Sequence, residues 1–245
     1  MPQDELSTIA QRRLELLRSG DIEIEGRMPW SSNATFLVRV CASSVGGKTS
    51  QGQAIYKPLR GERPLWDFDP GLYRREVAAY LLSEAMGFDL VPPTLVREGP
   101  LGEGSLQWFV DADHQEHYFT ILEKRADLHD QLRKMCVLDI VANNTDRKSG
   151  HCLLGRDDQI WGIDHGLCFA ADFKLRTVIW EFGGEPIPDS VVAPLERLVD
   201  RVPLGIASLL SDEETMAIQE RAEWLLQRGE LPIDETGRRY PWPLV

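Results

Sequence analysis

The stretch NNTDRKSGH, residues 143 to 151, is the part of this chain from which the rest is interpreted. It follows residues Leu128 to Asn143, whose apolar spacing predicts a helix, and it leads into a β-like piece at Cys152 to Leu154. Its small and polar residues predict a loop, with Asp146 inside it. A loop carboxylate suits a group that accepts a proton from an attacking hydroxyl. A structural Asx-turn is the alternative interpretation.

A second carboxylate stands in IWGIDHGLCF, residues 160 to 169. Asp164 follows the apolar, strand-like piece Ile160 to Ile163 and precedes a glycine by two residues. An aspartate at a strand end beside a glycine turn is a good oxygen ligand for Mg²⁺ that bridges phosphates. Asp164 lies 18 residues after Asp146, an interval that a β-hairpin fills. We therefore expect the carboxylates of Asp146 and Asp164 to lie close together, at one end of this hairpin.

Two further charges precede this region. Lys57 ends a β-rich segment, so its ammonium group can point from a sheet toward the phosphates of a nucleotide. Glu76 lies in RREVAAYLL, within a predicted helix at Leu72 to Met86, on the face that packs against the sheet. We expect an ion pair between Lys57 and Glu76. Solvated surface charges are the alternative for each residue taken alone.

The remaining pattern divides the chain into a strand-rich half and a helical half. Strands are predicted around Ile22 to Ile24 and at Thr35 to Cys41, Gln53 to Tyr56, Leu90 to Leu95 and Ser105 to Val110. Further helices are predicted at Asp4 to Ser19, Val191 to Leu209 and Asp212 to Arg228. This order predicts a two-lobed α+β fold, with an N-terminal helix at 1–19, a sheet with one long helix at 20–112, and a helical lobe at 113–245.

Composition excludes several classes of protein. The 245 residues carry 27 Lys and Arg against 39 Asp and Glu, a net charge of −12, which disfavours nucleic acids and anionic membranes as partners. No window approaches ~18 consecutive apolar residues, and the N-terminus lacks the apolar stretch of a signal peptide. The four cysteines form no CxxC pair. We expect a cytoplasmic protein without membrane association.

Two short stretches resemble known binding motifs but lack the residues or the spacing that these motifs require. GGKT at residues 46–49 resembles the end of a P-loop, but Ala42 stands where the first glycine is required, and strands flank the motif. A hairpin turn is the better interpretation. HQEH at residues 114–117 misses the spacing of the zinc-binding motifs, and we expect a polar hairpin there.

The pieces AIYKP, RREVAAYLL, GSLQWFV, NNTDRKSGH and GIDHGLCF resemble the phosphatidylinositol 3-/4-kinase superfamily, and in particular its small actinobacterial members. The resemblance covers roughly residues 20 to 190 and implies a protein-kinase-like fold, with an N-lobe at 20–112 and a reduced C-lobe at 113–245. It implies that Lys57 binds phosphate, that Glu76 is its helix partner, that Asp146 is the catalytic-loop aspartate and that Asp164 binds metal.

The resemblance also implies a nucleotide site for ATP with Mg²⁺ or Mn²⁺. Its hinge, which contacts adenine through the backbone, would comprise Gln107, Phe109 and Val110. Ser31, Ser32 and Asn33 would cover the phosphates in place of a glycine-rich loop. The family's second metal-binding residue, an asparagine five residues after the catalytic aspartate, is replaced by His151. Neutral histidine ligates Mn²⁺ but is a poor ligand for Mg²⁺.

These residues predict an ATP-dependent kinase whose acceptor is a soluble small molecule or a protein. Two alternatives stay open. His151 and the missing glycine-rich loop are also typical of a nucleotide-binding pseudokinase or switch. The family name points instead to a phosphatidylinositol kinase that acts on lipid.

Overall fold

The computed structural model describes residues 3–29, 31–43 and 49–244. The chain divides into two compact units. The sheet unit comprises residues 1–77 and 92–109, and the helical unit comprises residues 78–91 and 110–245. The hairpin turn predicted for GGKT falls on residues 46–48, which lie outside the described residues, and Thr49 is the first residue of a strand.

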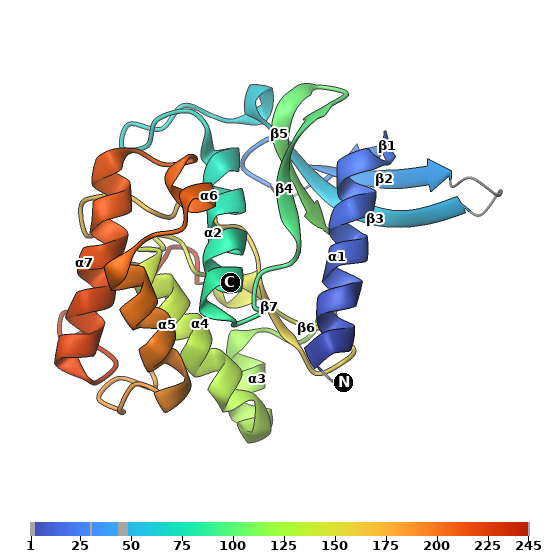
Figure 1. The fold of residues 1–245 in the computed structure, drawn as a ribbon. Helices are drawn as coiled ribbons and strands as arrows, with labels where there is room; N and C mark the ends of the chain where they lie inside the picture. The colour runs from blue at the N-terminus through green and yellow to red at the C-terminus, as the bar shows by residue number, and fades with distance from the viewer. Residues whose placement is uncertain (1–2, 30, 44–48, 245) are drawn as a thin grey trace. The chain divides into compact units, whose positions relative to one another are not determined.

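The sheet unit is built on five antiparallel strands in the order β1-β2-β3-β5-β4 (Figure 1). The strands are β1 (Asp21–Arg27), β2 (Phe36–Ser43), β3 (Thr49–Pro58), β4 (Thr94–Gly99) and β5 (Gly102–Trp108). The first three form an antiparallel meander. A 3-10 turn at Leu59–Gly61 follows β3.

Helix α1 (Gln3–Ser19) packs on this sheet. Its residues Leu16 and Leu17 join Val38, Tyr56 and Leu106 in a buried apolar cluster. Burying a leucine side chain stabilises a fold by roughly 1.5–3 kcal/mol, so these contacts hold the helix to the strands.

Helix α2 (Leu72–Met86) has the bounds that the sequence predicts, and the division between the two units runs through it. It ends at Gly87, which adopts a left-handed backbone conformation with φ of 67°. Glycine adopts this conformation without steric cost and commonly terminates helices.

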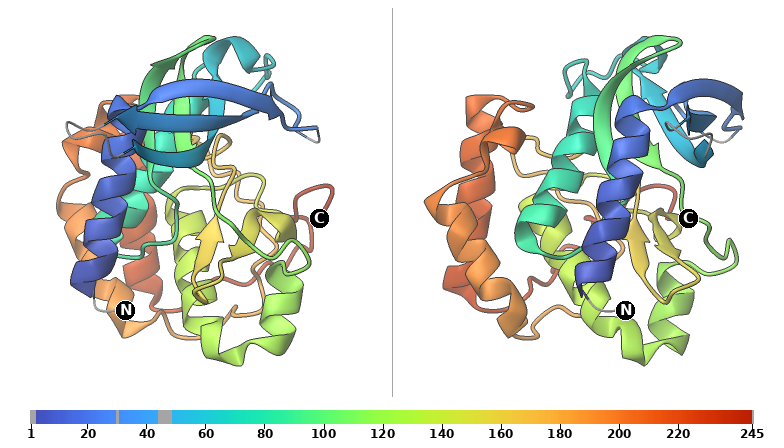
Figure 2. Two further views of the ribbon diagram at one scale, coloured as in Figure 1. Left: turned by 90° about the vertical axis from the view of Figure 1, so that its right-hand side faces the viewer. Right: turned by 45° about the vertical axis from the view of Figure 1, so that its right-hand side comes forward.

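The helical unit contains the helices α3 (Tyr118–Lys124), α4 (His129–Val141), α5 (Asp189–Asp200), α6 (Leu204–Ala207) and α7 (Asp212–Arg228). Helices α5 and α7 pack against each other. A two-stranded hairpin of β6 (Cys152–Leu154) and β7 (Ile160–Gly162) packs on α3 and α4 (Figure 2). Further 3-10 turns lie at Ala126–Leu128 and Ser149–His151. Ser211 caps α7 in a capping box with Glu214.

Three predicted elements differ from the structure, and proline explains two of them. The helix predicted at Val191 to Leu209 is divided into α5 and α6, because Pro203 cannot continue a helix. The strand predicted at Leu90 to Leu95, which its two prolines limit to an edge or a turn, begins only at Thr94 and lies at the edge of the sheet. The polar hairpin predicted for HQEH is wrong, because these residues form a turn that leads into α3, a helix that the sequence pattern did not predict.

Within the three described ranges, no helix combines the length and the apolar character required to span a membrane.

Candidate active site

Lys57 and Glu76 form the ion pair that the sequence predicts. Lys57 lies near the end of β3, and its Nζ donates to Oε1 of Glu76 on α2. The Glu76 side chain is buried, with 3% of its surface exposed, whereas the Lys57 side chain retains 20%. The buried carboxylate therefore holds the lysine side chain in one orientation.

Gly104 allows β5 to approach the backbone of Lys57 closely. Lys57 pairs with Ser105 in the β3–β5 ladder. A Cβ atom placed on Gly104 would lie 2.4 Å from the carbonyl oxygen of Lys57, a distance that real structures do not tolerate. A larger residue would displace the strand end that carries the lysine.

The segment predicted as the adenine hinge begins at the end of β5. The side chain of Gln107 is buried and donates to Oγ1 of Thr94 at 2.9 Å. The Phe109 amide donates to the carbonyl of Gln53 at 3.0 Å. The backbone contacts to adenine that the resemblance implies for Gln107, Phe109 and Val110 stay a prediction.

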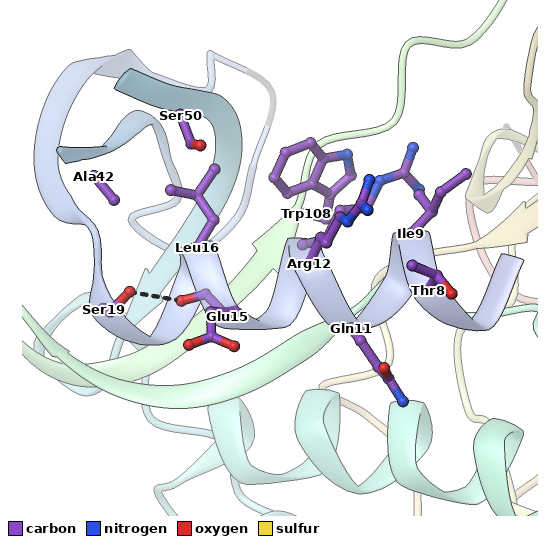
Figure 3. A pocket seen from close by; sticks show the side chains of 11 residues that line it. Thr8, Ile9, Gln11, Arg12, Glu15, Leu16, Ser19, Ala42, Ser50 and Trp108 are labelled. Atoms are coloured by element: carbon purple, nitrogen blue, oxygen red, sulfur yellow. Dashed lines mark hydrogen bonds between the residues drawn. The ribbon is translucent and has the colours of Figure 1, made fainter. Parts of the chain in front are cut away.

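Trp108 supports this segment on the opposite face, because neighbouring strand residues point to opposite sides. Its indole packs on Gly52, where an added Cβ would lie 2.2 Å from the ring. The guanidinium carbon of Arg13 on α1 lies 5.2 Å from the ring centroid. Figure 3 shows the indole between α1 and the strands, beside a hollow of about 680 Å³. Helix α1 thus supports the end of β5 through Trp108.

The predicted phosphate-covering residues lie between β1 and β2, as expected. Ser31 and Thr35 share a hydrogen bond of 2.8 Å between their hydroxyls. The side-chain oxygen of Asn33 accepts from the Arg63 amide at 3.0 Å. Two of the three predicted residues are therefore engaged in holding the loop, and Ser32 is the exposed member.

In the helical unit, Asp146 lies in the loop after α4. Its Oδ2 lies 3.0 Å from Nζ of Lys148. Burial raises the pKa of Asp146, and the hydrogen bond from Lys148 opposes that shift. The Asx-turn considered for Asp146 is made by Asn144 instead, whose side-chain oxygen accepts from the Asp146 amide at 3.0 Å. The aspartate carboxylate is thus not used by the turn.

His151 and Asp164 are brought together in the same unit. Nε2 of His151 lies 3.5 Å from Oδ2 of Asp164. Nδ1 of the same ring accepts from the Lys148 amide at 3.4 Å, so in the neutral ring Nε2 carries the proton. This tautomer donates toward Asp164, and a metal bound through Nε2 requires the other tautomer.

Asp164 has a left-handed backbone conformation, with φ of 60°. Aspartate is one of the few residues that adopt it at modest cost, and such strained residues cluster at functional sites. Its side chain is about half exposed. The turn therefore presents the carboxylate outward at the end of β7.

Comparison with known proteins identifies the family. The family model for phosphatidylinositol 3- and 4-kinases matches residues 72–211. The chain belongs to this family. Protein Rv2133c of Mycobacterium tuberculosis is 37% identical, over 93% of this chain and 94% of that protein. Phosphatidylinositol 4-kinase gamma 4 of Oryza sativa subsp. japonica is 35% identical over 54% of this chain. The match covers 30% of the rice protein.

Solved structures agree on the fold. The Golgi casein kinase with Mn/ADP bound has a TM-score of 0.57 and 15% identity, over 98% of this chain and 81% of that one. Hydra Fam20 with sugar has a TM-score of 0.59 and 12% identity, over 89% and 88%. The predicted protein-kinase-like α+β fold is confirmed, and the chain is a kinase.

A buried arginine, which the sequence interpretation did not single out, holds the loop after α4 and the turn after β7. Arg147 is fully buried and pairs with Asp139 on α4 at 2.8 Å. Its Nη1 donates to the carbonyl oxygens of His151 at 3.2 Å and Ile163 at 3.0 Å. One guanidinium therefore positions the backbone of His151 and of the residue directly before Asp164. The sequence signal was an acid at position 139 within the apolar helix segment MCVLDIV.

Arg147 also determines which ring nitrogen of His165 carries the proton. Nη2 of Arg147 lies 2.7 Å from Nε2 of His165. Because a guanidinium cannot accept a hydrogen bond, Nε2 accepts and the neutral ring carries its proton on Nδ1. Asp139 also accepts from Asn144 at 3.0 Å and from Thr177 at 3.2 Å. Although burial lowers the pKa of Arg147, the charge of Asp139 raises it above its ordinary value.

Proposed function

We propose that the chain is an ATP-dependent phosphotransferase with an N-lobe at 20–112 and a C-lobe at 113–245. Lys57, held by Glu76, neutralises the α- and β-phosphates of ATP, and the hinge at Phe109 and Val110 binds adenine. The observation that carries this proposal is the Lys57–Glu76 ion pair, which joins a strand-end cation to a buried carboxylate in a chain of this family.

Asp146 acts as the base that accepts the proton of the attacking hydroxyl group. Burial alone would keep this carboxyl protonated to a higher pH, and Lys148 counteracts that effect. The position of Lys148 beside Asp146 also puts a positive charge where the transferring phosphoryl group gains negative charge. The sequence interpretation did not single out Lys148.

A divalent cation, Mg²⁺ or Mn²⁺, fits the oxygen donors at the end of β7. Among the described residues, no three His, Cys, Asp or Glu side chains form a complete metal cluster. Kinase sites commonly hold Mg²⁺ through one or two carboxylates together with substrate phosphates. Asp164 would hold the cation, and His151 is the second protein ligand in its other tautomer. The bound cation would neutralise charge on the phosphates.

The test of this proposal is metal-dependent formation of ADP from ATP. Asp164→Asn should lower the rate by at least about 10²-fold, because the charge that holds the cation is lost. Asp200→Asn, an exposed aspartate at the end of α5, is the matched control and should leave the rate unchanged. An equal rate in Asp164→Asn would overturn the mechanism. A nucleotide-binding switch would instead show an ATP-dependent rise in Tm without ADP formation.

For the acceptor, we favour a soluble small molecule or a protein over a lipid. The net charge of −12 opposes binding to anionic bilayers. The decisive experiment is co-sedimentation with vesicles of phosphatidylcholine containing phosphatidylinositol, followed by assay for phosphorylated lipid. Absence of binding and of lipid product is expected. Tight binding with lipid phosphorylation would establish a lipid acceptor.

A further inference from the structure

A cavity of about 620 Å³ lies within the helical unit, among α4, α7, the segment that follows Asp164 and the C-terminal segment 232–239. Its volume is that of a site for a drug-sized molecule, which typically measures ~300–1000 Å³. None of the residues assigned above to nucleotide, metal or base lines it.

The walls of this cavity are aromatic. Phe173, Trp180 and Trp224 line it, and the first and last of these are each more than a third exposed. Arginine guanidinium groups lie over two of the rings, at 4.7 Å for Arg239 on Phe173 and 5.6 Å for Arg228 on Trp224. Flat apolar surfaces edged by cations suit an apolar body that carries negative charge.

A buried arginine also lines the cavity. Arg221 on α7 is 8% exposed. Its Nε donates to the carbonyl oxygen of Val141 at 2.8 Å, and its Nη1 donates to that of Ala170 at 3.3 Å. Its Nη2 is buried and has no hydrogen-bond partner within the described part of the chain. One donor of the guanidinium therefore remains for a ligand.

Arg221 differs from Arg147, another buried arginine, in having no carboxylate partner. Each guanidinium nitrogen of Arg147 is hydrogen-bonded, and Asp139 balances its charge. No ion pair to Arg221 occurs among residues 3–29, 31–43 and 49–244, and burial lowers its pKa to about 10. A buried charge without a counter-ion is costly, so an anion bound beside it is stabilising.

The carboxylates around the cavity do not act as counter-ions of Arg221. Asp234 accepts from the backbone amides of Thr236 at 3.0 Å and Arg239 at 2.9 Å, so it serves the C-terminal segment. Glu220 and Glu235 are exposed. Their charges are screened by solvent, unlike that of Arg221.

We propose that this cavity binds a small organic anion, whose acidic group accepts from Nη2 of Arg221 and whose apolar body packs against Trp180, Trp224 and Phe173. The site adjoins the catalytic loop. Lys174, next to Phe173, donates its amide to the Asn143 side chain at 2.9 Å, and Asn143 donates to the Asp172 carbonyl at 2.7 Å. The anion thus stabilises the segment that packs on this loop.

The test uses two fluorescent probes of similar shape, the aromatic sulfonate 8-anilinonaphthalene-1-sulfonate and the neutral N-phenyl-1-naphthylamine. Wild-type protein should bind both. Arg221→Met should weaken binding of the sulfonate by about tenfold or more, because a charge-assisted hydrogen bond is lost, and leave binding of the neutral probe within about twofold. Arg201→Met, an exposed arginine at the end of α5 that does not line the cavity, is the matched control and should change sulfonate binding by less than about threefold.

A second measurement uses wild-type protein alone, so that it does not depend on the folding of a variant. Decanoate should displace the sulfonate at concentrations at least about tenfold lower than decanol does, since only decanoate carries the charge that faces Arg221. Equal displacement by the two compounds, or equal sulfonate affinity in wild type and folded Arg221→Met, would overturn the proposal. Neither result depends on kinase activity.

Discussion

The two units each contain an ion pair at the centre of the candidate machinery, and the pairs differ in what else their cations contact. In the sheet unit, Lys57 binds Glu76 and keeps 20% of its side chain exposed. In the helical unit, Arg147 and Asp139 are 0% and 1% exposed. Arg147 additionally binds two backbone carbonyls and His165.

This difference separates the cation that we propose to bind phosphate, Lys57, from one that holds the fold, Arg147. Each nitrogen of Arg147 has a protein partner, so this guanidinium positions loops and offers nothing to a substrate. Lys57 binds a buried carboxylate and keeps 20% of its side chain exposed. Burial of a charged residue is therefore a poor guide to catalysis, and partial exposure beside a buried partner is a better one.

The largest expected effect is on stability, from Arg147→Met. Removal of one partner leaves Asp139 buried without its counter-ion, which should lower the free energy of unfolding by about 3–5 kcal/mol. Urea denaturation followed by circular dichroism measures it. The double variant Asp139→Leu with Arg147→Met should recover part of the loss. A loss below about 1 kcal/mol in the single variant would show that the pair does not hold these loops.

Lys57→Met should affect activity more than stability. The rate of ADP formation should fall by about 10²–10³-fold, because a charge that stabilises the transferring phosphates is lost. Because Glu76 is buried too, the free energy of unfolding should also fall, but by less than in Arg147→Met, since Lys57 keeps 20% of its side chain exposed and Arg147 none. Lys57→Arg keeps the charge beside Glu76 and serves as the control for folding. Unfolding as severe as that of Arg147→Met would remove the distinction between the two pairs.

His151→Asn should change the metal preference. An amide oxygen suits Mg²⁺ better than an imidazole does, so the ratio of rates with Mg²⁺ and Mn²⁺ should rise by about tenfold. Rates of ADP formation across a titration of each metal give this ratio. An unchanged ratio would mean that His151 does not contact the metal.

The smallest effect is a change in pH dependence, from Lys148→Met. Burial raises the pKa of Asp146 and Lys148 opposes the shift, so removing the lysine raises this pKa further. The base must be ionised to act, and the acidic limb of the pH–rate profile should therefore move to higher pH. A shift to lower pH would contradict the roles given to both residues.

The sequence predicted those features that depend on local pattern. The apolar period predicted the bounds of α2, and charge type with position predicted the Lys57–Glu76 pair. The contacts of Arg147 could not be predicted in this way, because its partners at 139, 151, 163 and 165 meet only after folding. The same holds for Arg221, whose burial depends on how α7 packs on the end of α4. Helix α3 was missed because the polar turn before it resembles a hairpin.

The most direct test of the central claim separates nucleotide binding from chemistry at Asp146. ATP affinity in the presence of Mn²⁺ is measured by calorimetry for wild type and Asp146→Asn, and ADP formation is then measured at saturating ATP. We predict similar affinities and a rate at least about 10²-fold lower in the variant, because only the proton acceptor is removed. Equal rates at equal occupancy would contradict the assignment of Asp146 as the base.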